Sequence, residues 1–391
     1  FSKYFPNSEF INAKVHFLTL VIAVMFLSKK IIEQNLPNLN SFKLPLMKNN
    51  IMSKLSRKEF IYQIPKAELH LHIEGSFEPE LMFEIAKRNE LKIRFKSVEE
   101  VKEAYKFNNL QEFLDIYYEG AGVLIHENDF YDMTWAYLEK IHAENVLHTE
   151  IFFDPQSHTE RGIAFETVFN GVYNALQDGE EKLGISFEII MCFLRHLDEA
   201  SAFKTLESAL PFKDQIIGVG LDSGELGNPP SKFKNVFAKA IEEGFLTVAH
   251  AGEEGPAEYV WEALDLLNVT RIDHGNRSLE DSKLVERLAE EQMPLTLCPL
   301  SNLKLCVIKD MKDYPLLDMM FKNLMCTINS DDPAYFGGYL SANYLAVAEA
   351  LDLDNEIIYQ LAKNSFEASY LSDEEKDAMI QKVDDFYLEN Q

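Results

Sequence analysis

Cysteine is scarce in this sequence, and basic side chains are outnumbered. The chain of 391 residues contains 4 cysteines, and its 37 lysines and arginines stand against 64 aspartates and glutamates, for a formal net charge of −27. So few cysteines, without a CxxC pair, exclude a disulfide scaffold and indicate reduced thiols in a cytoplasmic protein. The acidic surplus opposes binding to nucleic acid or to anionic membranes, so small soluble partners are favoured.

A hydrophobic run long enough to span a membrane is also missing. The apolar stretch 15–27 is interrupted by His16 and Thr19 and is closed by Lys29 and Lys30. As a helix it would span about 20 Å, against about 30 Å for a bilayer core, so we expect no stable membrane association. The lysines also stand where a signal peptide would have small residues. We interpret residues 1–51 as an extension outside the fold, with a targeting segment as the alternative, and residues 52–391 as the functional domain.

From residue 60 onward, short β-rich segments alternate with long amphipathic ones. Strands are predicted at 68–74, 148–154, 187–193, 216–222, 245–250, 271–274, 294–298 and 325–330. Helices are predicted at 79–89, 135–145, 163–183, 233–243, 257–267, 279–291 and 374–388. Alternation of this kind predicts an α/β fold, a (β/α)8 TIM barrel with C-terminal helices and a helical insertion at 77–147, after the first strand.

Polar residues gather where the predicted strands end, which is where barrels of this class carry their chemistry. The candidates are His70, His72 and Glu74, Asp154, Asp222 and Glu225, His250 and Glu253, His274, Ser301 and Asn302, and Asp331 with Asp332. Each has a structural alternative when taken alone: the histidines as hydrogen-bonded core residues, and the last aspartates as a turn or helix cap.

Together the histidines predict a metal site. His70 and His72 are two residues apart in a strand, so both imidazoles lie on one face. With His250 and Asp331 they offer three nitrogens and one carboxylate to a divalent ion that keeps room for water. The fourth predicted strand has no lysine that could bridge two ions, which indicates one metal. Such an ion lowers the pKa of its water, and His274 is placed to orient or deprotonate that water. Glu253 is then the candidate proton donor to substrate.

Four motifs in this order resemble the adenosine/adenine deaminase branch of the amidohydrolase superfamily: His70-x-His72, His250-Ala-Gly-Glu253, Asp273-His274-Gly275 and Ser330-Asp331-Asp332-Pro333. The resemblance covers about residues 60–390. It implies a site ligated by His70, His72, His250 and Asp331, most readily for Zn²⁺ with Fe²⁺ as the alternative. It also implies that Glu253 protonates N1 of the purine, that His274 steers hydroxide to C6, and that Asp332 bonds N7 before ammonia leaves.

Within this branch, details favour the free base adenine and a role in purine salvage. Glu74 stands where adenosine deaminases usually place an aspartate that contacts ribose, and its longer side chain would intrude on the sugar. The segments 221–230, 298–305 and 332–339 also resemble adenine deaminase. We hypothesise that Glu225 reaches the N3/N9 edge of the base, with a solvated loop carboxylate as its structural alternative.

Other functions stay open at this stage. Adenosine deaminase and deamination of an N6-substituted adenine are the enzymatic alternatives. A metal-binding barrel without catalysis should lack Glu253 or His274, and both are present. Whether the chain forms a homo-oligomer is left open.

Overall fold

The computed structural model describes residues 55–107 and 109–390, and the predicted extension at 1–51 lies outside them. Eight strands form one sheet in which each pairs in parallel with the next. They are β1 (Lys66–His72), β2 (Val146–Phe153), β3 (Ser186–Leu194), β4 (Gly218–Asp222), β5 (Leu246–Ala251), β6 (Arg271–His274), β7 (Pro294–Leu297) and β8 (Met325–Ile328). The predicted barrel is therefore confirmed.

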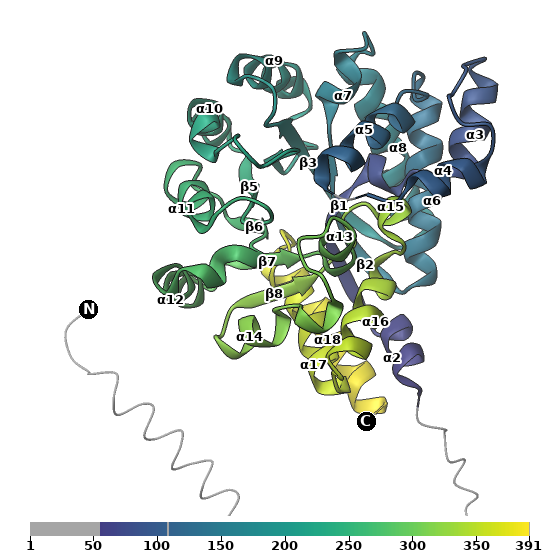
Figure 1. The fold of residues 1–391 in the computed structure, drawn as a ribbon. Helices are drawn as coiled ribbons and strands as arrows, with labels where there is room; N and C mark the ends of the chain where they lie inside the picture. The colour runs from purple at the N-terminus through teal and green to yellow at the C-terminus, as the bar shows by residue number, and fades with distance from the viewer. Residues whose placement is uncertain (1–54, 108, 391) are drawn as a thin grey trace, which may run out of the picture. The chain divides into compact units, whose positions relative to one another are not determined.

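Helices cover the outside of the barrel (Figure 1). They are α2 (Arg57–Gln63), α3 (Pro79–Arg88), α4 (Val98–Ala104), α5 (Leu110–Ala121), α6 (Glu127–Ala143), α7 (Pro155–Thr159), α8 (Phe165–Leu183), α9 (Glu199–Ala209), α10 (Lys234–Glu243), α11 (Ala257–Leu266), α12 (Ser282–Glu291), α13 (Pro299–Lys304), α14 (Leu316–Phe321), α15 (Pro333–Phe336), α16 (Leu340–Ala350), α17 (Asn355–Glu367) and α18 (Asp373–Glu389). None of these helices in the described part of the chain combines the length and hydrophobicity needed to cross a bilayer.

The seven helices predicted from the sequence correspond to α3, α6, α8, α10, α11, α12 and α18. The predicted insertion after the first strand consists of α3, α4, α5 and α6. The helix predicted at 135–145 is wrong at its start, because α6 begins at Glu127, where His126 and Asp129 form a capping box ahead of a polar first turn. Next to it, α8 approaches closely at Gly171, where a methyl group would overlap the Cβ of Phe130 at 2.7 Å.

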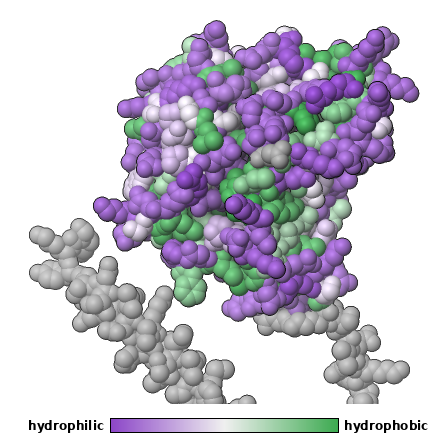
Figure 2. Space-filling view, in the orientation of Figure 1, coloured by the Kyte–Doolittle hydropathy of each residue, from purple (hydrophilic) through white to green (hydrophobic). Residues whose placement is uncertain are grey.

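In strand β1, apolar and polar residues alternate between the two faces of the barrel wall. Ala67, Leu69 and Leu71 alternate with polar residues, yet all seven residues of the strand are buried. One side of the strand faces the barrel interior, and α17 packs along β1 and β8 on the outside. On the face shown in Figure 2, hydrophobic residues gather toward the middle and hydrophilic residues cover most of the rim.

The barrel closes between β8 and β1 through few backbone bonds. The Asp331 amide donates to the carbonyl of His70 at 3.1 Å, and the His72 amide donates to the carbonyl of Asp331 at 3.0 Å. Below them, the side-chain oxygen of Asn329 accepts from the Leu69 amide at 2.9 Å, so a side chain replaces a rung of the ladder. The seam between the first and last strands thus runs directly past the candidate metal ligands.

Candidate active site

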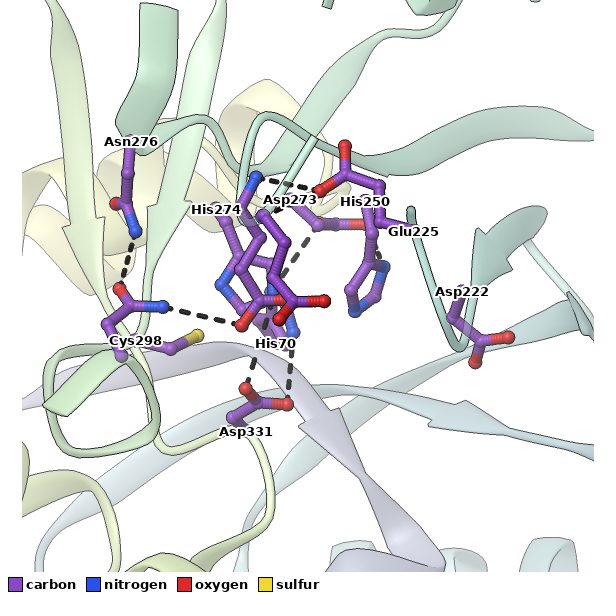
Figure 3. A network of polar contacts seen from close by, with 12 residues as sticks. His70, Asp222, Glu225, His250, Asp273, His274, Asn276, Cys298 and Asp331 are labelled. Carbon is purple, nitrogen blue, oxygen red and sulfur yellow. Dashed lines mark hydrogen bonds and ion pairs between the residues drawn. The ribbon is translucent and has the colours of Figure 1, made fainter. Parts of the chain in front are cut away.

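A cluster of histidines and an aspartate occupies the carboxyl ends of the strands (Figure 3). His70 and His72 come from β1, His250 from β5 and His274 from β6, while Asp331 follows β8. The Nε2 atoms of His72 and His250 lie 3.1 Å apart, and Nε2 of His70 lies 3.4 Å from Oδ1 of Asp331. Oδ1 of Asp331 also lies 3.6 Å from Nε2 of His72. The structure therefore brings together the four residues that the sequence proposes as metal ligands.

Hydrogen bonding around His70 shows that this cluster suits a cation. The hydroxyl of Thr296 donates to Oδ1 of Asp273 at 3.0 Å, so its oxygen accepts from Nδ1 of His70 at 2.9 Å. In the neutral ring this leaves Nε2 of His70 as a lone pair, buried without a hydrogen-bond partner and facing the Asp331 carboxyl. A cation between these two acceptors would relieve their repulsion, and a set of three imidazoles and one carboxylate suits Zn²⁺.

Burial keeps His250 and His274 in the neutral form. Burial, followed by repulsion from the neighbouring imidazoles, lowers the pKa of His250 well below its usual range. Burial and His70 in the same way lower the pKa of His274 to about 3. Burial opposes ionisation of Asp331, but the neighbouring imidazoles, His70 first among them, hold its pKa well below its usual range. Neutral imidazoles beside an ionised carboxylate are the protonation states that metal ligation requires.

Asp273 lies behind the cluster and orients it. Its carboxyl oxygens lie 3.8 Å from Nδ1 of His70 and 3.6 Å from Nδ1 of His250, and Arg271 approaches to 3.6 Å. All of these side chains are buried. A carboxylate at the distal nitrogens of ligating histidines fixes ring orientation and raises ligand basicity.

Glu253 and His274 form the candidate acid and base pair. Nε2 of His274 lies 3.5 Å from Oε2 of Glu253 and 3.9 Å from Oδ2 of Asp331. Burial, and then the charge of Asp331, raises the pKa of Glu253 well above its usual range, which favours the protonated acid. Asn302 donates to its other oxygen at 3.4 Å. A protonated acid and a neutral imidazole thus lie side by side at the cluster.

Two of these residues have backbone conformations that side chains rarely adopt. His274 has a φ of 65° and Asp331 a φ of 64°, both in the left-handed region. Such conformations cost about 1–3 kcal/mol each and are concentrated at functional sites. They turn the two side chains inward just after β6 and β8.

Asp332 depends on a glycine for its position. A methyl group on Gly75 would lie 2.6 Å from Cγ of Asp332, so only glycine leaves room for this side chain. Its Oδ1 is buried without a partner. Burial, and then the charge of Asp331, raises the pKa of Asp332 well above its usual range. Asp332 can therefore donate a hydrogen bond into the pocket.

The cluster opens into a small pocket at the carboxyl ends of the strands. Helix α5 covers one side with Leu110, Phe113, Leu114, Tyr117 and Tyr118. The remaining lining residues are His72, Asp154, Asp222, Ser223, His250, Glu253, His274, Leu305, Asp331 and Asp332. Apolar walls with several convergent polar groups are typical of small-molecule sites.

Glu74 and Glu225 do not line this pocket. Oε1 of Glu74 is 2.8 Å from Nε2 of His158, behind the pocket wall. The carboxyl of Glu225 accepts four hydrogen bonds from backbone amides, those of residues 252 to 255, at 2.7 to 3.1 Å. The placement of both differs from the expected substrate contacts, because four backbone amides engage the Glu225 carboxyl and His158 lies against Oε1 of Glu74. Glu225 instead holds the loop that carries Glu253.

Other pocket residues had no predicted role. Asp154 and Asp222 stand among the polar residues at predicted strand ends, and the structure places both in the pocket wall. In the sequence, only their position at the ends of predicted strands pointed to these two residues. Tyr117 donates to Oδ2 of Asp154 at 3.3 Å, and no pattern in the sequence distinguishes it from the other aromatic residues of α5.

Comparisons with known proteins agree with this geometry. Residues 65–386 match the adenosine deaminase family. The chain is 63% identical over 329 residues to the adenine deaminase of Acinetobacter baylyi, which covers 84% of this chain and 99% of that protein. It is 58% identical over 333 residues to the adenine deaminase of Hahella chejuensis, covering 85% and 99%. The crystal structure of adenine deaminase from Arthrobacter aurescens is similar with a TM-score of 0.82 and 49% identity, over 83% of this chain and 99% of that one.

Proposed function

The chain belongs to the adenosine deaminase family, and we propose that it catalyses the hydrolytic deamination of adenine to hypoxanthine and ammonia. The observation that carries this proposal is the buried cluster of His70, His72, His250 and Asp331 beside Glu253, whose pKa is raised by burial, in a chain whose curated relatives are adenine deaminases.

The protein side chains supply the proton transfers. Glu253 donates its proton to N1 of the purine, which lets the ring accept electron density as C6 is attacked. His274 accepts a hydrogen bond from the attacking water and orients it toward C6, since its ring is neutral. Asp332 donates a hydrogen bond to N7 and fixes the plane of the base.

One divalent ion, Zn²⁺ by preference and Fe²⁺ as the alternative, would be held by His70, His72, His250 and Asp331. When bound, it supplies a Lewis acid that makes hydroxide available near neutral pH. Asp273 keeps the histidine rings oriented toward it.

Glu74 and Glu225 act indirectly in this scheme. Glu225 positions Glu253 through the backbone amides of its loop. Glu74, paired with His158, occupies the space behind the pocket wall, where it limits the room for a sugar.

The experiment that tests the function follows purine absorbance with adenine, adenosine and N6-methyladenine in parallel. We expect rapid turnover of adenine, its loss in the Glu253→Gln variant, and its loss with a chelator and recovery with Zn²⁺. Turnover of adenosine with adenine untouched would refute the proposal.

The proposal also covers the pathway, the cellular location and residues 1–51. The reaction suits purine salvage by a cytoplasmic enzyme, and the four cysteines, all free thiols, are compatible with that compartment. Residues 1–51 are proposed to contribute no chemistry, so a protein that starts at Met52 should keep full turnover. Cell fractionation and light scattering would test the location and a homo-oligomeric state.

A further inference from the structure

Asp154 is a buried acid that the mechanism above leaves unused. It directly follows β2 and is 3% exposed. Tyr117 donates to its Oδ2 at 3.3 Å, whereas its Oδ1 is buried without a partner. Leaving a buried polar atom unpaired is unfavourable, so an unpaired oxygen in a pocket wall indicates a missing donor.

The side-chain neighbours of Asp154 include two carboxyls, Glu74 and Asp222, which can share a proton with it but offer no N–H group. Glu74, on the side away from the pocket, is a carboxyl that accepts from the Asp154 amide at 3.4 Å. Asp222 is also buried in the wall, and its Oδ2 lies 3.5 Å from Nδ1 of His72, which makes it the partner of a metal ligand. The side chains of Asp222 and Asp154 share a hydrogen bond, and no described N–H group donates to Oδ1 of Asp154. A ligand in the pocket is the remaining source of an N–H group.

The order of strands around the barrel relates Asp154 to the reacting groups. Glu253 follows β5, and in an eight-stranded barrel β5 stands across from β1. Asp332 follows β8 and Asp154 follows β2, so these two carboxyls flank β1 on the wall opposite Glu253. A purine with N1 at Glu253 directs its five-membered ring toward that wall, with N7 on one flank and N9 on the other.

We propose that Oδ1 of Asp154 accepts a hydrogen bond from N9–H of the free base and so determines specificity for adenine over N9-substituted purines. The inference rests on the proposed adenine deaminase function. Adenine carries a proton at N9, and a nucleoside carries a sugar there, which would leave Asp154 unpaired and meet Tyr117. A site built to bond an N–H group rejects an analogue without it by about 10⁴-fold. Asp332 at N7 and Asp154 at N9 together select the 9H tautomer.

The test compares kcat/KM for adenine and 9-methyladenine, which lacks N9–H but adds only a methyl group. The wild-type holoenzyme should prefer adenine by about 10⁴-fold, and Asp154→Ala should reduce this preference at least 100-fold, mainly by slowing adenine. Asp198→Ala is the matched control, because Asp198 caps the helix after β3 and should leave the preference unchanged. If Asp154→Ala does not fold, Asp154→Ser replaces it.

The outcomes separate the two proposals. A wild-type enzyme that does not deaminate adenine refutes the proposed function. An enzyme that deaminates adenine but keeps its preference in Asp154→Ala, or that turns over 9-methyladenine as well as adenine, refutes the role of Asp154. One atom each of His72, Asp154 and Asp222 lies within 4.8 Å of the others, so metal content is measured too. A second equivalent of Zn²⁺ that is lost in Asp154→Ala would assign the unpaired oxygen to a cation instead.

Discussion

The substitution Glu225→Gln separates two roles that a buried carboxyl beside an active site can have. Oε1 of Glu225 accepts from the Gly252 amide at 2.7 Å. Oε2 accepts from the amides of Glu253, Glu254 and Gly255 at 3.1, 2.8 and 2.7 Å. The change keeps the shape of the side chain but converts one acceptor oxygen into an amide donor.

The number of hydrogen bonds that Glu225 accepts sets the expected loss of unfolding free energy. The glutamine side chain retains most hydrogen bonds when its oxygen takes the Oε2 position. Its NH₂ group then faces the Gly252 amide, which is also a donor. The Gly252 amide therefore stays unpaired, at a cost of about 1–3 kcal/mol. The three remaining bonds lose their charge assistance, about 1 kcal/mol each. Because such terms are not additive, we expect the free energy of unfolding to fall by about 3–5 kcal/mol.

Urea denaturation and steady-state kinetics with adenine measure both effects. Since the loop positions Glu253, we expect kcat to fall at least about 100-fold while KM changes little. Glu262→Gln is the control, because Glu262 accepts one backbone bond at the surface, from Ser231 at 2.9 Å, and should change stability by less than about 0.5 kcal/mol. A Glu225→Gln protein of normal stability with a raised KM would refute the reasoning and indicate direct contact with the base.

Three further changes test other parts of the structure. Gly75→Ala should lower kcat/KM for adenine at least about 100-fold by displacing Asp332, with metal content retained; wild-type kinetics would contradict the close approach. Asp273→Asn should weaken metal binding about 10–100-fold in competition with a chelator, and unchanged affinity would exclude an orienting role. Glu188 lies opposite Glu150 on the paired strand, and burial, followed by that charge, raises the pKa of Glu188 to about 7. Its ionisation lowers stability as the pH rises from 4.5 through 7, so Glu188→Gln should raise the free energy of unfolding by about 1 kcal/mol at pH 8 and not at pH 4.5; an equal change at both pH values would contradict this.

The barrel and the reacting groups could be predicted because they follow a periodic rule. The strands are short β-rich segments between helical patterns, and unusual polar residues gather at their carboxyl ends. The strand predicted at 271–274 has those bounds in the structure, and His274 ends it. Sequence order alone then brings His70, His250 and Asp331 to the same end of the barrel.

Residues outside that rule could not be placed from the sequence. Glu225 was expected to face the base, but the fold of the loop after β5 directs four amides at its carboxyl, and no pattern encodes that backbone conformation. The start of α6 was missed because its first turn is polar. The cover of the pocket by α5 depends on how the insertion packs against the barrel, which is a matter of tertiary contacts.

The seam between β1 and β8 has a consequence for how the protein acquires its activity. His70 and His72 lie near the beginning of the barrel and Asp331 near its end, and they become neighbours only when the first and last strands join. Such pairing closes the largest loop in the fold and has the highest contact order, so we expect it late in folding. During synthesis the emerging chain would carry its histidines for most of translation without their aspartate. Enzyme activity would therefore appear in refolding only as the barrel closes, and it would report that step more directly than the gain of helix does.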